Sequence, residues 1–421
     1  MIESHMIIGS RIKSNGNRGR AGRLLLSAPV LALALVNSVS QIGCQSSDTL
    51  GSNVTGSECT ICDSCCADDG ETLALLATGQ QESYAEGDDG NFEFGTTGES
   101  ERFQSCGDGT VLDTATGLMW LADASCLRTN GGDFETDGIP DGHVAWAEAL
   151  RFVREINAGS YPACAAGYDD WHLPNARELE SLVNSGQAAP NEWLMDEGFQ
   201  LVEGGAYWSS TTYSGLSDTL AFVVDFQDGT LSHVENKSRV ASSVLPVRQA
   251  CGDGQPAVAA TGQFESFADG DDGGTLSGVA VPEERFVDNG DGTVTDSFSG
   301  LMWMRDVSCQ GSGSWEQAMA AALSFNRNRK VATCEAYTAI HTDWRLPNRR
   351  ELLSVIDFSQ NEPALPADHP FANLDAEAGF WTSTTYARNT NMAWYLDIAT
   401  GDVEEDAKSN RRYIWFVRTA D

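Results

Sequence analysis

The sequence predicts an α+β protein that contains two copies of one module. Residues 77–126 align without a gap on residues 260–309, and more than half of the aligned positions are identical, which indicates an internal duplication. Each copy begins with short strand-like runs, continues with two amphipathic helical patterns and ends with further strand-like runs. Because strands and helices are grouped rather than alternating, the order is typical of an α+β fold.

The duplication continues beyond the gapless segment. A DWHLPN motif from Asp170 matches DWRLPN from Asp343, and WSSTTY in the first copy matches WTSTTY in the second. Both copies end on Val-Arg in the same alignment. We therefore place module 1 at residues 77–251 and module 2 at residues 260–421.

The elements of module 2 illustrate the order within each copy. A Gly-rich and Asn-containing turn at residues 288–293 separates two apolar runs and predicts a β-hairpin. Ser314 with Gln317, and Asn348 with Glu351, match the capping-box pattern that begins a helix. Alternating apolar runs after the second helix predict the final strands. We expect a twisted antiparallel sheet and two short helices in each module.

The charge of the chain excludes several partners. Asp and Glu number 61 against 26 Lys and Arg, which gives a formal net charge of -35. Nucleic acids and sulfated polyanions bind to basic surfaces that neutralise phosphate or sulfate groups. We therefore expect no nucleic-acid partner, and sulfated polyanions are disfavoured.

The first 43 residues predict a signal peptide of the lipoprotein type. Basic residues precede an apolar run at Leu24–Val36, which is too short to span a bilayer comfortably. Gly followed by Cys44 resembles a lipoprotein cleavage site, although Gln41 stands where such sites usually have Leu. Ordinary signal cleavage and a retained anchor are the alternatives. We expect an exported lipoprotein of the bacterial outer membrane or cell surface, contacting the membrane through its lipid alone, or a secreted protein if Cys44 is not lipidated.

The eleven cysteines predict disulfides, because an exported chain matures in an oxidising compartment. The repeat supplies the pairing, since two cysteines recur in both copies and two others are missing together from copy 2. The predicted disulfides are Cys106 with Cys251, Cys126 with Cys164, and Cys309 with Cys334. Residues 44–76 form a Cys-containing tether rich in Ser, Thr, Gly and Asp. After Cys44 the tether contains four more cysteines, which we expect to form two local disulfides, with zinc binding as the alternative: Cys59, Cys62, Cys65 and Cys66.

One acidic loop has the spacing of a calcium site. Asp133, Glu135, Asp137 and Asp141 surround Gly138 in a segment that only module 1 contains. Alternating carboxylates around a glycine turn supply the several oxygen ligands that calcium requires. The alternative is a solvated acidic loop. Calcium is the only cofactor that we expect.

The repeated motifs GDGTVTDxxxGLMW, DWRLPNxxEL and WxSTTY resemble the bacterial domain family named after the C-terminal domain of the Legionella collagen-like protein. The resemblance covers both modules. It implies a C-type lectin-like fold in which two helices flank a twisted antiparallel sheet and the first and last strands pair. It also implies an exported surface protein connected with adhesion or glycan binding. The sulfated ligand of the founding member does not fit the acidic charge of this chain.

The fold implied by this resemblance places a ligand surface on the loops between the late strands. The motifs EPN, QPD and WND of sugar-binding C-type lectins are absent from the sequence, so calcium-bridged sugar binding is not supported. Aromatic, amide and guanidinium groups of the kind that suit sugars or peptide loops occur in these loops. The candidate ligand-binding residues are Tyr213, Ser214, Asp218, Tyr386, Arg388, Asn389, Asn391 and Trp394. The alternative for Trp394 is a place in the core.

The sequence therefore favours an exported, surface-associated protein that binds a glycan or protein ligand and is not an enzyme. The first alternative is a structural envelope or assembly component without a small ligand. The second is an enzyme, because DWRLPNRREL resembles a segment of formylglycine-generating enzymes, which use reactive cysteines. The module cysteines are expected to pair, which leaves no obvious reactive thiol.

Overall fold

The structure is a computed structural model, and it describes residues 72–97, 101–134, 137–215, 218–250, 258–328, 334 and 336–420. All of these belong to one compact unit of the chain. The predicted signal peptide, Cys44, Cys251 and the four tether cysteines lie outside the described residues. Within the described ranges, none of the helices has both the length and the apolar character that crossing a bilayer requires.

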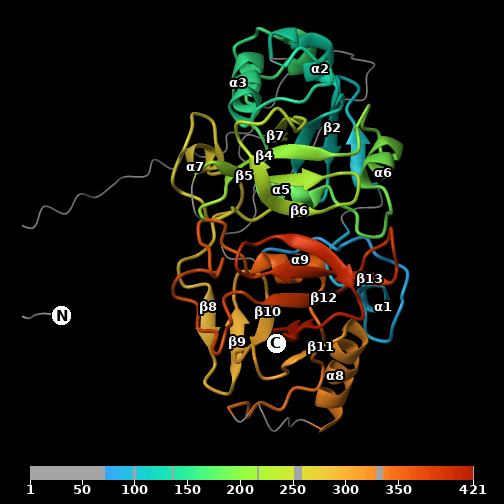
Figure 1. Cartoon of the computed structure of the whole chain (residues 1–421), viewed down its shortest axis with the longest axis vertical. Helices are drawn as coiled ribbons and strands as arrows, with labels where there is room; N and C mark the ends of the chain where they lie inside the picture. Colours follow the sequence, from blue (N-terminus) through green and yellow to red (C-terminus); the bar gives the residue numbers. More distant parts are fainter. Residues whose placement is uncertain are drawn as a thin grey trace, which may run out of the picture. The chain divides into compact units, whose positions relative to one another are not determined.

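Each repeat consists of a leading arm and a body. We call residues 72–97 arm 1, residues 101–250 body 1, residues 258–279 arm 2 and residues 280–420 body 2 (Figure 1). The arms contain the helical turns α1 (Asp89–Phe92) and α7 (Asp272–Thr275). The elements of body 1 are β1 (Phe103–Ser105), β2 (Thr110–Asp113), β3 (Leu118–Leu121), α2 (Cys126–Asn130), η1 (Gly132–Phe134), α3 (Trp146–Asn157), α4 (Pro162–Ala165), α5 (Ala176–Ser181), α6 (Pro190–Asp196), β4 (Ala206–Thr212), β5 (Leu220–Asp225), β6 (Leu231–Asn236) and β7 (Val247–Gln249). The elements of body 2 are β8 (Phe286–Asp288), β9 (Thr293–Asp296), β10 (Leu301–Met304), β11 (Ser312–Gly313), α8 (Trp315–Asn328), α9 (Arg349–Ser354), β12 (Gly379–Thr385), β13 (Met392–Asp397), β14 (Val403–Ala407), β15 (Arg412–Tyr413) and β16 (Val417–Thr419).

The early strands form one small antiparallel sheet in each body, in the orders β1-β2-β3-β7 and β16-β10-β9-β8. The hairpin predicted at residues 288–293 is confirmed as the β8–β9 pair. The last strand of each body pairs with the third strand, β3 or β10, and not with the first as the family resemblance implied. Both third strands are buried along their whole length, so each needs a hydrogen-bonding neighbour on both sides.

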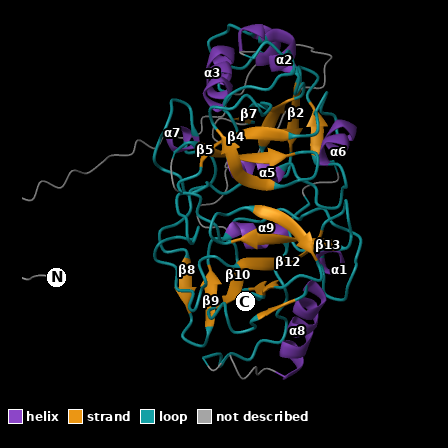
Figure 2. Ribbon diagram, viewed as in Figure 1, coloured by secondary structure: helices purple, strands orange, loops and turns teal. Residues whose placement is uncertain are grey.

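The late strands of both bodies, together with β11 before α8, form a single eight-stranded sheet, in the order β11-β15-β12-β13-β14-β6-β5-β4. Val403 in β14 of body 2 pairs with Leu231 in β6 of body 1. One sheet therefore runs from one repeat into the other through this pair. The strands of both bodies are drawn in orange in Figure 2.

Both bodies contain the two predicted helices, and the capping boxes explain where the second helix begins. Asn175 caps α5 and Asn348 caps α9, each in a reciprocal pair with the Glu three residues later. Body 1 differs from the prediction because it also contains the short helices α2, α4 and α6. Proline at the start of α4 and α6 favours helix initiation there.

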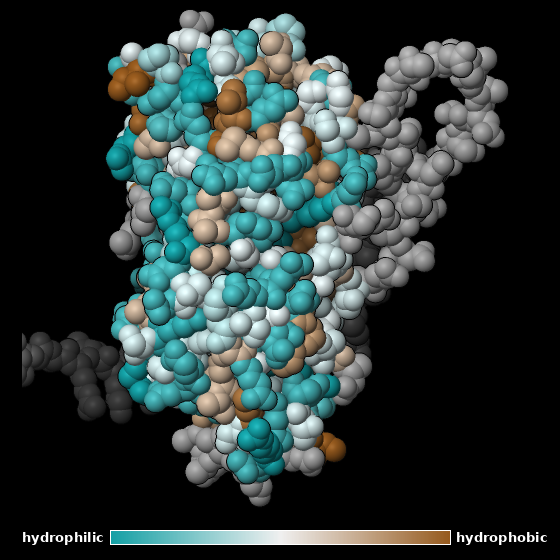
Figure 3. Space-filling view, turned by 90° about the vertical axis from the view of Figure 1, so that its right-hand side faces the viewer, coloured by the Kyte–Doolittle hydropathy of each residue, from teal (hydrophilic) through white to brown (hydrophobic). Residues whose placement is uncertain are grey.

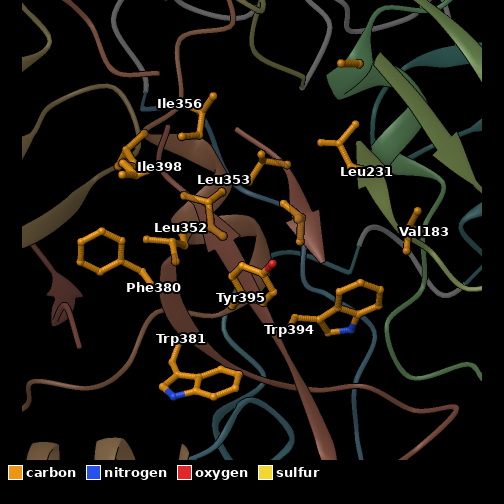
Figure 4. Packing of buried hydrophobic residues seen from close by; sticks show 14 of the residues in the cluster. Val183, Leu231, Leu352, Leu353, Ile356, Phe380, Trp381, Trp394, Tyr395 and Ile398 are labelled. Carbon is orange, nitrogen blue, oxygen red and sulfur yellow. The ribbon is translucent and has the colours of Figure 1, made fainter. Parts of the chain in front are cut away.

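A shared hydrophobic core joins the bodies. Val183 and Leu231 of body 1 belong to the same cluster as Leu353 and Trp394 of body 2 (Figure 4). The tryptophans of the repeated motifs are buried, as predicted: Trp120, Trp171, Trp303 and Trp344. The continuous sheet and the shared core make the two bodies one packed structure.

Arm 1 lies on body 2, although it leads into body 1. Its helical turn α1 packs against β12. The backbone N–H of Thr385 donates to Gln80 Oε1 at 2.7 Å, and Asn348 Nδ2 donates to the carbonyl oxygen of Phe94 at 3.1 Å.

Arm 2 lies on body 1 in the equivalent way, with α7 packed against β4. The backbone N–H of Thr212 donates to Gln263 Oε1 at 3.0 Å, and Asn175 Nδ2 donates to the carbonyl oxygen of Ser277 at 3.1 Å. The repeats therefore exchange their arms reciprocally. Each arm lies on the body of the other repeat and keeps a backbone hydrogen bond to its own body, from Ser185 N–H to the Thr78 carbonyl and from Phe358 N–H to the Thr261 carbonyl.

Candidate ligand-binding cleft

The late-strand loops bury the aromatic residues that the sequence predicts as a ligand surface. Trp394 is 1% exposed and Tyr386 is 6% exposed, and their rings meet edge to face at 5.1 Å. The guanidinium group of Arg349 lies 4.1 Å from the ring centroid of Trp394. Tyr213 is buried too, with its ring centroid 4.0 Å from that of His233. The structure corrects the prediction for these three aromatic residues, because protein groups already occupy the surfaces that an external sugar would contact.

Two polar members of the predicted surface connect the bodies instead. Ser214 Oγ donates to the carbonyl oxygen of Phe358 at 3.4 Å, and Arg388 Nη1 donates to the carbonyl oxygen of Gln227 at 3.4 Å. The other three residues of the predicted surface are exposed: Asp218, Asn389 and Asn391. For those three a ligand role stays a prediction.

A cleft of about 860 Å³ opens where arm 1 meets body 1. Arm 1 forms one wall with Thr78, Gly79 and Gln81, while body 1 forms the rest with β1, the chain after α5 and helix α6. The arm approaches body 1 closely at Gly79, where a β-carbon would lie 2.2 Å from Asn184 Oδ1. Gly79 also has φ +88°, a conformation that favours glycine.

An aromatic side chain on α6 faces this cleft. Pro190 begins α6, and the buried Leu194 anchors the helix to the core. Trp193 lines the cleft and is partly exposed. Its ring meets Phe103 edge to face at 5.6 Å, and Phe103 meets Phe199 in the same way at 5.4 Å. The cleft therefore contains an accessible indole held by a rigid aromatic cluster.

The charges that line the cleft are mainly negative. Glu101, Asp196 and Glu197 contribute carboxylates. The guanidinium of Arg102 is already paired, with Nε and Nη2 donating to the Asp113 carboxylate at 2.9 and 2.6 Å. A further N–H of its Nη2 bonds the carbonyl oxygen at the end of α5. The cleft therefore suits a neutral or cationic ligand and repels an anionic one.

Body 2 has no equivalent of α6. The residues after Pro363 form no helix up to β12, all of them being described. No aromatic residue follows Pro363 at the spacing by which Trp193 follows Pro190. Among the described residues, helix α6 and its indole are thus specific to the first repeat. The face of the molecule that carries α6 and α1 is largely hydrophilic, with scattered apolar side chains (Figure 3).

The predicted calcium loop is described only in part. Glu135 lies outside the described residues, and the side chain of Asp133 is not described. Asp137 accepts a hydrogen bond from the N–H of Ile139, and Asp141 accepts one from the N–H of His143. The described residues contain no group of three or more His, Cys, Asp or Glu side chains placed to hold a metal ion.

Calcium binding by this loop stays a prediction, and a thermal titration checks it. We expect calcium at about 1 mM to raise the melting temperature by binding the folded state alone. The Asp137→Ala variant should lose this increase, and a chelator should reverse it in the natural chain. Equal melting temperatures with calcium and with chelator would contradict the prediction.

Two of the predicted disulfides are present. Cys126 bonds Cys164 with a Cα–Cα distance of 5.8 Å, and Cys309 bonds Cys334 with a distance of 4.9 Å. Cys106 is also disulfide-bonded. Its predicted partner lies outside the described residues, so that pairing stays a prediction.

Comparison with known families gives two matches in this chain. The Lcl C-terminal domain model matches residues 109–248 and 292–418, which together make up more than half of the chain. The chain belongs to this family. Its Lcl C-terminal domains occur here in tandem, and the family is one of bacterial surface-associated domains. Both arms lie outside the matched ranges. A search of curated proteins found no match.

Comparison of the two repeats in the sequence could have indicated the cleft through one difference between them. Motifs shared by the two Lcl C-terminal domains, such as DWHLPN and DWRLPN, build the common fold. Trp193 differs between the two repeats, because the second domain has no aromatic residue at the corresponding position. A large aromatic residue in only one of two copies is a stronger candidate for binding than one in both.

Proposed function

We propose that this protein is exported, attached to the membrane through a lipid on Cys44, and binds an external glycan in the cleft of body 1 without catalysis. The observation that carries the proposal is the partly exposed Trp193, which lines the cleft together with Asn184 and Gln187. Aromatic rings contact the apolar faces of sugars, and side-chain amides donate to and accept from sugar hydroxyl groups. The membership of a surface-associated family supports the location.

The carboxylates of the cleft restrict the class of glycan. Glu101, Asp196 and Glu197 repel sulfate and carboxylate groups but accept hydrogen bonds from hydroxyls. We therefore propose a neutral or amino-bearing glycan. A sulfated ligand like that of the founding member of the family fits this chain poorly.

One observation favours a structural role as a second candidate. The late-strand loops, where the resemblance placed a ligand surface, are used to join the bodies through Ser214 and Arg388. An envelope spacer would need such a joined pair of bodies and no ligand. A purely structural role predicts that no glycan binds in the cleft.

A glycan array with the full chain tests the proposed function. We expect neutral or amino-bearing glycans to bind, and Trp193→Ala to weaken that binding by about 10-fold to 100-fold, as removal of a central Trp does at many interfaces. The matched control is Met195→Ala, which removes a residue that is 40% exposed on the same helix and is not among the residues lining the cleft. Equal losses in both variants, or binding only of sulfated glycans, would contradict the proposal.

A further inference from the structure

The wall of the cleft is connected to body 2 through one buried carboxyl group. Asp89 in arm 1 is 2% exposed. Its Oδ2 accepts hydrogen bonds from Thr78 Oγ1 at 2.6 Å and from Thr384 Oγ1 at 2.7 Å. Thr78 lines the cleft of body 1, whereas Thr384 lies in β12 of body 2. A single oxygen atom therefore links the cleft wall to the other body.

A second link runs through the neighbouring residue of the arm. Gln80 accepts from the backbone N–H of Thr385 at 2.7 Å, and its own N–H donates to Thr78 Oγ1 at 3.2 Å. Gln80 is buried, while Gly79 and Gln81 on either side of it line the cleft. The segment that forms the wall is thus hydrogen-bonded to body 2 on its rear side.

A lysine of body 2 holds the far part of the arm. Lys408 Nζ lies 3.8 Å from the ring centroid of Trp315 and 5.2 Å from that of Tyr84 in arm 1. It also donates to Thr385 Oγ1 at 2.8 Å. Body 2 therefore contacts arm 1 through a cation between two aromatic rings as well as through hydrogen bonds.

We propose that body 2 positions the ligand-binding wall of body 1, so that Thr384 and Lys408 control the affinity of a cleft that neither residue touches. This inference rests on the proposed function, since it concerns the same cleft. It assigns the second repeat a role as the support of the first. The cleft then has the wall formed by arm 1 only while arm 1 is packed against β12.

The duplication supplies a matched control. In arm 2, Asp272 Oδ2 accepts from Thr261 Oγ1 at 2.6 Å and from Thr211 Oγ1 of β4 at 2.7 Å. Thr211 and Thr384 each also accept one backbone N–H at the start of a helix. The two threonines are therefore equivalent in their contacts, but arm 2 contributes nothing to the cleft.

The experiment compares Thr384→Val with Thr211→Val in the full chain. Hydrogen exchange of peptides covering residues 77–81 should accelerate about tenfold in Thr384→Val, the effect of losing one hydrogen bond to a carboxylate. In protein labelled with 5-fluorotryptophan, the ¹⁹F line of Trp193, assigned with Trp193→Phe, should shift in the same variant. Both signals should stay unchanged in Thr211→Val. Lys408→Met provides a second variant should Thr384→Val fold poorly.

The outcomes separate this inference from the proposed function. Neither hydrogen exchange nor the ¹⁹F line requires a ligand, so both can be read even if no glycan binds. Unchanged exchange at residues 77–81 and an unchanged Trp193 line in Thr384→Val and Lys408→Met would overturn the inference. So would equal changes in Thr211→Val. If a neutral glycan binds to the array, its affinity should fall in Thr384→Val and persist in Thr211→Val.

Discussion

Replacing Glu180 with glutamine should lower the free energy of unfolding by about 3 kcal/mol or more, the usual effect of removing one partner from a buried ion pair. Glu180 is 4% exposed at the contact between the bodies. Its carboxylate lies 3.3 Å from Arg349 Nε and 3.9 Å from Arg350 Nε. Burial lowers the pKa of Arg177 and of Arg349 to about 10, and the nearby Glu180 opposes that change. The variant would leave the buried guanidinium groups of Arg349 and Arg350 without the carboxylate with which they pair.

The arginines around Glu180 join the bodies reciprocally. Arg350 donates to the carbonyl oxygens of Ser181 and Val183 in body 1. Arg177 donates in turn to those of Ser354 and Ile356 in body 2. Loss of the carboxylate should therefore destabilise both bodies together, in one transition.

Urea denaturation checks this expectation, with Glu155→Gln as the matched control. Glu155 pairs with Arg151 at 2.7 Å on the surface of α3, and such exposed pairs contribute about 0.5 kcal/mol. A loss for Glu180→Gln as small as that for Glu155→Gln would show that Glu180 does not stabilise the contact.

The second large effect is on the dependence of stability on pH, and it comes from Asp272. Burial raises the pKa of this carboxyl from 3.8 to about 7, although its hydrogen bonds from Thr211 and Thr261 act in the opposite direction. Because the pKa is higher in the folded state, the stabilising contribution is complete below pH about 4 and is lost as the pH rises to about 7. The shift corresponds to an upper limit of about 4 kcal/mol.

Asp272→Asn should therefore stabilise the protein at pH 8 and not at pH 4, because asparagine stays neutral and keeps an oxygen for both threonines. Melting temperatures at the two pH values measure this difference. The control is Asp271→Asn, whose two carboxylate oxygens accept from three backbone N–H groups. That variant should destabilise the protein at pH 8. Destabilisation by Asp272→Asn at pH 8 would contradict the expectation.

The two arms should respond to pH differently because different charged groups surround their buried carboxyl groups. The pKa of Asp89 is raised by burial to only about 6, and Arg345 is among the groups that lower it. Arg345 pairs with Glu351 at 2.5 Å. Body 1 has His172 at the equivalent position, 3.1 Å from Glu178. Arm 1 should thus loosen at a lower pH than arm 2.

Much of the fold could be predicted because the local sequence patterns and the comparison of the two repeats indicated the same elements. The capping boxes at Asn175 and Asn348 located the second helix of each body, and the shared cysteines gave the pairs Cys126–Cys164 and Cys309–Cys334. These features depend on short-range spacing or on comparison of two aligned copies. Neither requires knowledge of which body an arm contacts.

The exchange of arms could not be predicted for the same reason. Gln80 and Gln263 make equivalent bonds to Thr385 and Thr212, so the identical motifs would satisfy the same contacts within one repeat or between two. The error in the late-loop prediction has another origin. Trp394 looks suited to a ligand when its sequence segment is considered alone, but tertiary packing buries it against Tyr386 and Arg349 of the same body.

Reciprocal exchange also sets an order for biosynthesis. The hydrogen bonds from Thr384 and Thr385 to arm 1 span 295 and 305 residues of the chain. Arm 2, by contrast, meets Thr211 across only 61 residues. Because the chain is synthesised from its N-terminus, β4 already exists when arm 2 is made, and arm 2 can pack against it at once. Arm 1 must wait for nearly all of body 2, and so the earliest described segment of the protein reaches its final place last.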